Sequence, residues 1–215
     1  SANSLSNGDA TFDFFDDFLG TSLNTSKWNY YISSGSLSIS NGILTINGGS
    51  SATGGINGIA SKLLFSYNTA LRIRIIMTAP RGVSWEWKER GFSDANLTTA
   101  SHFTINNAVL ANQENYPGTS QNFLTLNAGS STTTSSLPNI ISWSIEEYRR
   151  IGTTSAQYVI NDSVKVTHTT NIPTTNLYVV AGAGNNAGSN AIQIDWILIR
   201  KYTSPEPTIT LGSEE

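Results

Sequence analysis

The chain has 215 residues, no cysteine and a formal net charge of −3. A chain of this length can bury a core large enough to fold without disulfides, and the absence of cysteine excludes thiol nucleophiles, cysteine-ligated metals and thiol redox chemistry. The acidic balance, with no cluster of Lys and Arg, argues against a nucleic-acid partner. No apolar run has the length of a membrane-spanning helix, so membrane insertion is not expected.

Charged residues make up only 13% of the chain, whereas about 25% is usual in globular domains. Ser, Thr, Asn and Gly take their place, which predicts a neutral, polar surface. Such a surface hydrogen-bonds well to hydroxyl-rich ligands and is unlike the Lys- and Glu-rich surface of cytosolic proteins. The composition therefore indicates an extracellular protein, either secreted or on the cell surface.

Strand-like alternation recurs along the chain, and no stretch keeps the three-and-four spacing of a helix. The turn Asn41-Gly42 between two alternating segments predicts a hairpin over residues 37–46. Further strands are expected at residues 70–77, 83–92, 101–105, 123–126, 141–145, 156–160, 177–180 and 192–199. The polar stretches are expected to be loops, at residues 47–58, 112–121 and 128–136. Many short strands broken by turns predict an all-β sandwich or barrel.

The two ends of the chain differ in composition from its middle. Residues 1–11 are mostly small and polar, and residues 203–215 combine two prolines with acidic side chains. Both segments are typical of linkers or tails. We therefore expect one domain over residues 12–202, joined to neighbouring domains of the same polypeptide.

Three motifs follow one another in the chain. They are Phe15-Asp16-Asp17-Phe18-Leu19-Gly20 with Leu23 to Trp28, Tyr158-Val159-Ile160-Asn161-Asp162 with Val166 to Pro173, and Ile194-Asp195-Trp196-Ile197-Leu198-Ile199. In this order they resemble the frame of glycoside hydrolase family sixteen, within the concanavalin A-like lectin/glucanase superfamily. The resemblance spans most of residues 12–202 and implies a two-sheet antiparallel jelly-roll β-sandwich.

The family's glucanases carry their acids on one strand as Glu-x-Asp-x-x-Glu or Glu-x-Asp-x-Glu. Retaining glycosidases need two carboxyl groups about 5–5.5 Å apart, which alternate positions on one strand face supply. In the corresponding segment of this chain, Glu86 and Glu89 are three positions apart and should point to opposite faces. The middle acid is also missing. We therefore expect a non-catalytic protein, with residual glycosidase activity as an alternative.

The same strand supplies the candidate sugar-binding residues, and two interpretations of it remain open. In one, Trp85 and Trp87 line a concave sheet and stack on sugar rings; in the other they are core residues. Under the second interpretation the opposite face of the strand binds ligand hydroxyls, through Glu86, Lys88 and Arg90. Periodicity favours this second interpretation slightly, because that face is so polar. His102 alternates with apolar neighbours and is expected to line the same concave surface. Three other tryptophans lie in apolar strand contexts and are expected in the core, namely Trp28, Trp143 and Trp196.

Asp195 lies within a nearly continuous apolar run, where an unpartnered carboxylate would be costly to bury. In the resembling family the matching aspartate binds a structural calcium together with backbone carbonyl groups. The resemblance therefore implies a calcium site formed by Asp195, Gly42 and Asp17. The alternative is that Asp195 accepts backbone N–H groups or pairs with Arg200 or Lys201.

These observations lead to three functional hypotheses. The first is a non-catalytic carbohydrate-binding module of a secreted multidomain protein, which binds a neutral polysaccharide or other glycan on the concave sheet. The second is a structural or adhesive module of a cell-surface protein or filament. The third is a residual glycoside hydrolase.

Overall fold

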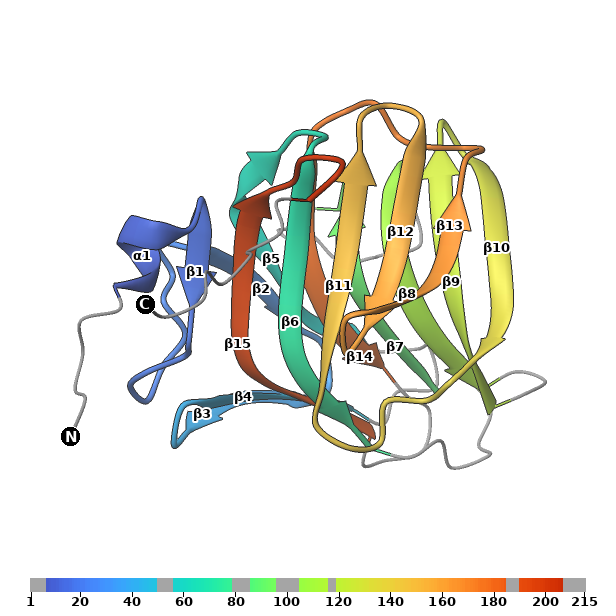
Figure 1. Cartoon of the computed structure of the whole chain (residues 1–215). Coiled ribbons are helices and arrows are strands. Elements are labelled where there is room, and N and C mark those ends of the chain that lie inside the picture. Colours follow the sequence, from blue (N-terminus) through green and yellow to red (C-terminus); the bar gives the residue numbers. More distant parts are fainter. Residues whose placement is uncertain are drawn as a thin grey trace, which may run out of the picture.

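The computed structural model describes residues 7–49, 56–78, 86–95, 105–115, 119–184 and 190–206. Within these residues the chain forms two antiparallel β-sheets that stack face to face (Figure 1). The helix of the described part, α1 (Gly8–Thr11), has four residues and cannot span a membrane. The fold class predicted from the sequence, an all-β two-sheet antiparallel sandwich, is therefore confirmed.

The first sheet contains eight strands, and β1 pairs with β15 beside the main path of the sheet. Its members in spatial order are β13 (Ser163–His168), β12 (Ser155–Ile160), β11 (Ser144–Ile151), β6 (Thr69–Met77), β15 (Asn190–Lys201), β4 (Ile43–Gly48) and β3 (Ser36–Ser40), with β1 (Phe14–Asp16). The second sheet contains seven strands. In order they are β10 (Ser130–Leu137), β9 (Thr119–Asn127), β8 (Ala108–Asn115), β7 (Trp87–Ser93), β14 (Leu177–Gly184), β5 (Ile56–Phe65) and β2 (Trp28–Ile32).

The hairpin predicted at the Asn41-Gly42 turn forms as β3 and β4. Asn41 and Gly42 have φ angles of 53° and 73°, as a two-residue turn that matches the twist of its strands requires. Burial alternates along β4, so that Leu44 and Ile46 face the core. The strands expected at residues 70–77, 156–160, 177–180 and 192–199 likewise lie within β6, β12, β14 and β15.

Several expectations about polar segments were wrong. Most of residues 128–136 belong to β10, and most of residues 112–121 belong to β8 and β9, although both stretches were expected to be loops. The polar composition is explained by position, because β10 is the edge strand of its sheet and its burial pattern is mostly exposed. Two expected strands also differ from the structure. The strand expected at 141–145 begins only at Ser144, as β11. Of the strand expected at 101–105, residues 101–104 lie outside the described residues, and Ile105 is not in a strand.

The core lies between the sheets and combines aliphatic residues of both with Trp28, Phe92, Phe123 and Tyr148. Asp16 of the opening motif accepts two buried hydrogen bonds at the edge of this core. Asp16 accepts hydrogen bonds from the Trp28 indole at 2.6 Å and from the backbone N–H of Phe18 at 2.9 Å. The motif therefore fixes the first strands against the core.

Trp143 and Trp196 do not lie in the core, contrary to expectation. Trp143 is 38% exposed. Trp196 pairs with Arg74 in the register of β15 and β6, and is half-buried on the outer face of the first sheet. A β-bulge between Ile194 and Trp196 shifts the alternation of β15 and turns the indole outward.

Candidate functional site

Strand β7 presents two chemically different faces, and its register settles which one points inward. Arg90 lies opposite Ala111 and Ala181, and Phe92 lies opposite Val109 and Val179. All four partners belong to the hydrophobic core between the sheets. Lys88 and Arg90 therefore point between the two sheets, whereas Trp87 and Glu89 point to the outer side of the seven-stranded sheet.

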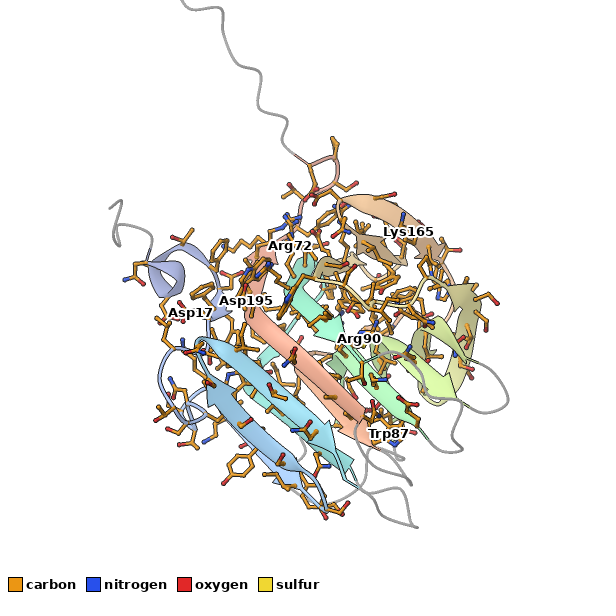
Figure 2. All side chains as sticks on the ribbon, turned by 90° about the horizontal axis from the view of Figure 1, so that it is seen from below. Asp17, Arg72, Trp87, Arg90, Lys165 and Asp195 are labelled. Carbon is orange, nitrogen blue, oxygen red and sulfur yellow. The ribbon has the colours of Figure 1, made fainter. Side chains whose placement is uncertain are left out.

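The inward face places a buried arginine at the centre of the sandwich (Figure 2). Arg90 donates from Nε and Nη2 to the two oxygens of Glu146 in β11 at 2.8 and 2.6 Å. Its Nη2 also donates to Oε1 of Gln121 at 2.7 Å. Because Glu146 belongs to the other sheet, this bidentate ion pair ties the two sheets together.

Two tyrosines complete the coordination of Glu146. The hydroxyl of Tyr148 donates to Glu146 at 3.1 Å, and that of Tyr158 donates to its other oxygen. Burial, followed by the charge of Glu146, raises the pKa of both tyrosines well above the ordinary range. Burial alone would lower the pKa of Arg90, but Glu146 and the tyrosines reverse this and raise it. The guanidinium of Arg90 therefore stays protonated, and the phenols of Tyr148 and Tyr158 stay neutral.

A second buried pair continues the inward face. Nζ of Lys88 donates to Glu86 at 2.9 Å and to Oε1 of Gln113 in β8 at 3.0 Å. Burial lowers the pKa of Lys88, and the hydrogen bond and charge of Glu86 oppose this. Nε2 of Gln113 donates in turn to Oδ1 of Asn139 at 2.9 Å.

This geometry corrects the sequence interpretation of the polar face. Glu86, Lys88 and Arg90 are at most 2% exposed and point into the sandwich, so the expectation that they line an outer ligand surface was wrong. The polar face is buried because Glu146 of the opposite sheet supplies the matching charge for Arg90, and Glu86 does so for Lys88. The expected divergence of Glu86 and Glu89 is confirmed, since Glu89 belongs to the opposite face of the strand.

The outer face of the seven-stranded sheet carries one continuous row of residues, paired across six strands. We call this the outer row, and it consists of Asn122, Asn112, Glu89, Gly182, Gly58 and Tyr31. Its three polar side chains and Tyr31 are half-buried. Between Glu89 and Tyr31 the two glycines leave the backbone of β14 and β5 without side chains. The sequence analysis missed this row, because it depends on pairing between distant strands.

Trp87 lies beside the outer row and belongs to neither interpretation drawn from the sequence. It points to the outer side of the sheet, yet it is only 8% exposed. A Cβ atom added at Gly184 would lie 2.3 Å from the indole ring, and one added at Gly182 would lie 3.7 Å from it. The indole therefore covers glycine backbone, and the missing side chain at Gly184 makes room for it. Trp85 and His102 lie outside the described residues.

His168 is a buried structural residue of β13. Its two ring nitrogens hydrogen-bond to the hydroxyl groups of Thr125 and Thr134, at 3.0 and 2.9 Å. Burial lowers the pKa of His168. The ring thus connects β13 with β9 and β10 across the end of the sandwich.

Comparison with solved structures finds the same architecture in proteins of low sequence identity. The endo-beta-1,3-glucanase from Pyrococcus furiosus has a TM-score of 0.68 at 12% identity, covering 90% of this chain and 95% of that one. For the Bacillus licheniformis beta-glucanase the TM-score is 0.66 at 13% identity, with 87% and 97% covered. The chain has the concanavalin A-like lectin/glucanase fold.

The fold is also shared with a protein of the lectin type. The carbohydrate recognition domain of Emp46p, in its metal-free form, has a TM-score of 0.64 at 11% identity and covers 83% of this chain and 89% of that one. A family described as a domain of unknown function, DUF2341, matches residues 1–42. No curated protein matches the sequence. The concanavalin A-like fold thus occurs in both glucanases and carbohydrate-binding proteins, and it does not by itself assign catalysis.

Two residues of the expected calcium site, Asp17 and Asp195, lie on the same side of the molecule (Figure 2). A Cβ atom added at Gly42 would lie 3.6 Å from the carbonyl oxygen of Asp17, so these two residues adjoin. Asp195, however, pairs with Arg74, whose guanidinium lies over the ring of Trp143. No group of three acidic or histidine ligands occurs among the described residues.

This donor set is a poor fit for calcium, which ordinarily takes six to eight oxygen ligands. A calcium ion would have to share the carboxylate of Asp195 with the guanidinium group of Arg74. Arg74 also replaces the partners considered from the sequence, since Arg200 pairs instead with Glu147 and Glu206. The described contacts favour an ion-pair role for Asp195, and the calcium site stays a prediction.

Replacing Glu146 by Ala should strongly destabilise the fold. Breaking a buried ion pair from one side costs about 3–5 kcal/mol, because the remaining charge is left uncompensated. The matched control is Asp162→Asn, which removes one of the two charges paired with Arg72, at a carboxylate that is 73% exposed. Asn is tolerated at the positive φ of this position, so the change should cost no more than about 1 kcal/mol. Urea unfolding of both variants measures the difference, and equal losses would contradict a buried network.

Removal of calcium should leave the melting temperature of the protein unchanged, because Arg74 already meets the charge of Asp195. The measurement compares thermal melts in excess calcium and in excess chelator, with Asp195→Asn as the matched variant. For that variant we expect a loss of less than about 1 kcal/mol, as for a half-exposed ion pair. A melting temperature that falls on chelation in the native chain, but not in Asp195→Asn, would instead establish the calcium site.

Proposed function

We propose that this chain is a carbohydrate-binding module that holds a neutral polysaccharide on the outer row and lacks glycosidase activity. The observation that carries the proposal is the composition of that row, in which two amides, a carboxylate and a tyrosine are half-buried on one face of the sheet. Carboxamide and carboxylate groups accept and donate hydrogen bonds in patterns that suit sugar hydroxyls. The half-buried ring of Tyr31 offers apolar surface for the C–H face of a pyranose ring.

The side chain of Asn122 contributes a buried hydrogen-bond acceptor to the outer row. Oδ1 of Asn122 is buried and has no hydrogen-bond partner among the described residues. A buried acceptor left in this state is costly, so a ligand donor at this position would relieve the cost. Because this oxygen is buried, the Asn122 side chain would have to turn outward for a sugar hydroxyl to reach it in the proposed complex.

The proposed lack of catalysis rests on the positions of the acids in and beside β7. The outward positions of β7 include Trp87 and Glu89, in a segment where the resembling glucanases have the pattern Glu-x-Asp-x-Glu. Of these two positions only the last retains an acid, and Glu86 points into the core with Lys88. A retaining mechanism needs two carboxyl groups about 5–5.5 Å apart on the same side of the sugar chain. This strand provides one.

The neutral composition and the low charge support a place outside the cell, as a module of a larger secreted or surface protein. In that setting the module would keep a partner domain of the same polypeptide close to its polysaccharide. Linking two binding or catalytic units in one chain raises their effective concentration without new contacts.

Binding to neutral glycans should depend on the outer row. We expect Asn122→Ala, Asn112→Ala and Glu89→Gln each to weaken binding about three- to tenfold, because each removes a hydrogen bond of about 0.5–1.5 kcal/mol. Calorimetry against soluble β-glucans and other neutral polysaccharides measures this. Lys165→Ala, on an exposed position of β13, is the control and should bind like the native chain. Affinity that survives all three outer-row changes would place the ligand elsewhere, and absence of binding to every glycan would favour a structural or adhesive module.

Hydrolysis of laminarin, lichenan, agarose and carrageenan should be undetectable in a reducing-end assay. The reason is the missing acid pair on the outward face of β7. The assay includes Glu89→Gln and a double variant with Glu114→Gln, because Glu114 lies opposite Trp87 in the strand register. Turnover by the native chain that disappears in either variant would overturn the non-catalytic proposal.

A further inference from the structure

Lys88 and Gln113 form an unusual contact inside the sandwich. They are directly opposite in the register of β7 and β8, and both are buried, at 0% and 1% exposure. Nζ of Lys88 lies 3.0 Å from the carboxamide oxygen of Gln113 and 2.9 Å from a carboxylate oxygen of Glu86. An amine, a carboxamide and a carboxyl group thus meet where water is excluded.

We propose that Lys88 and Gln113 form an intramolecular isopeptide bond. In this reaction the lone pair of Nζ attacks the carboxamide carbon of Gln113, and a new C–N bond forms. The bond from that carbon to Nε2 breaks, and one molecule of ammonia leaves. Glu86 takes a proton from the Lys88 amine and returns one to the departing nitrogen, so protons and electrons balance without an oxidant, a cofactor or a second protein.

The position of each group suits its part in this reaction. The carboxyl of Glu86 contacts the attacking nitrogen directly, within hydrogen-bond distance of the proton it would move. Nε2 of Gln113, the leaving nitrogen, donates to Oδ1 of Asn139 at 2.9 Å, which fixes the orientation of the carboxamide. Since both reactants are held by neighbouring strands, the step is intramolecular and proceeds without the entropy loss of a bimolecular encounter.

Burial also favours the neutral, nucleophilic form of the amine. It lowers the pKa of Lys88, and the positive charge of Arg90 adds to this effect, while Glu86 opposes it. Burial disfavours a charged amine, so the neutral form that attacks the carboxamide is reached more readily here than in water. The same exclusion of water protects the product amide from hydrolysis.

The proposed bond would be a covalent cross-link between β7 and β8. These strands carry Glu89 and Asn112, the neighbours of the linked residues on the outer face. The bond would fix the spacing of the outer row and would resist the separation of the two strands under mechanical load. The inference does not depend on glycan binding and would hold equally for a structural or adhesive module.

The mass of the purified chain tests the proposal directly. We expect an intact mass lower than the sequence mass by one ammonia, and a single linked species after tryptic digestion that contains both Lys88 and Gln113. Lys88→Met should restore the full sequence mass, whereas Lys165→Met, at an exposed lysine, should still show the ammonia loss. A native chain of full sequence mass, with the two peptides recovered separately from folded protein, would overturn the proposal.

Two further variants distinguish this bond from other losses of ammonia. Gln113→Glu should give the same linked peptides with loss of water instead of ammonia, and Glu86→Gln should reduce the linked fraction at a given time after synthesis. A succinimide at Asn41-Gly42 loses the same ammonia, but it joins no two peptides. An ammonia loss that maps to such a site and persists in Lys88→Met would therefore contradict the isopeptide bond.

Discussion

The ion pair between Arg90 and Glu146 constrains the whole arrangement of this sandwich. A guanidinium between two sheets is tolerated only with a carboxylate in bidentate geometry and with its remaining donors satisfied. Glu146, Gln121 and the carbonyl of Ala111 provide this set from three other strands of the structure. The positions of β7, β8, β9 and β11 relative to one another therefore follow from one buried charge, in addition to the packing of the core.

The same constraint determines what the outer face of the seven-stranded sheet displays. Once Arg90 and Lys88 point inward, strand alternation turns Trp87 and Glu89 outward. Glu89 then joins Asn112 and Asn122 in a row of half-buried polar groups. Glycines in β14 and β5 extend this row without side chains, and Trp87 covers Gly184 beside it. The buried charge network thus determines which residues of β7 the proposed sugar-binding surface displays.

Much of the fold could be predicted from sequence, because local patterns control it. The Asn41-Gly42 turn and the alternation along β6 and β15 act within a few residues, so the corresponding strands were predicted well. The face of β7 could not be assigned in this way. A polar face ordinarily meets solvent, and only the distant Glu146 reverses this for Arg90. The adjacent acids Glu146-Glu147 were a possible signal, since one of two successive strand residues must face the core.

In the other sheet, the bulge in β15 likewise could not be predicted from local sequence patterns. A regular alternation through Asp195 places either its carboxylate or Trp196 in the core, but the shift in register turns both outward and lets Arg74 pair with Asp195. Likewise, the Ser- and Thr-rich β10 has a loop-like composition and becomes a strand because β9 offers it hydrogen bonds. These features depend on partners far away in the chain, which composition and spacing do not reveal.

The orientation of β7 is the central claim, and cysteine accessibility tests it most directly because the chain contains no cysteine. The measurement compares maleimide labelling of Glu89→Cys with that of Lys88→Cys, the latter combined with Glu86→Gln so that no buried carboxylate is left without its partner. Under native conditions we predict that the thiol at position 89 reacts readily and that the thiol at position 88 reacts only after unfolding. Rapid labelling at position 88 with protection at position 89, in variants that retain native circular dichroism, would contradict the account.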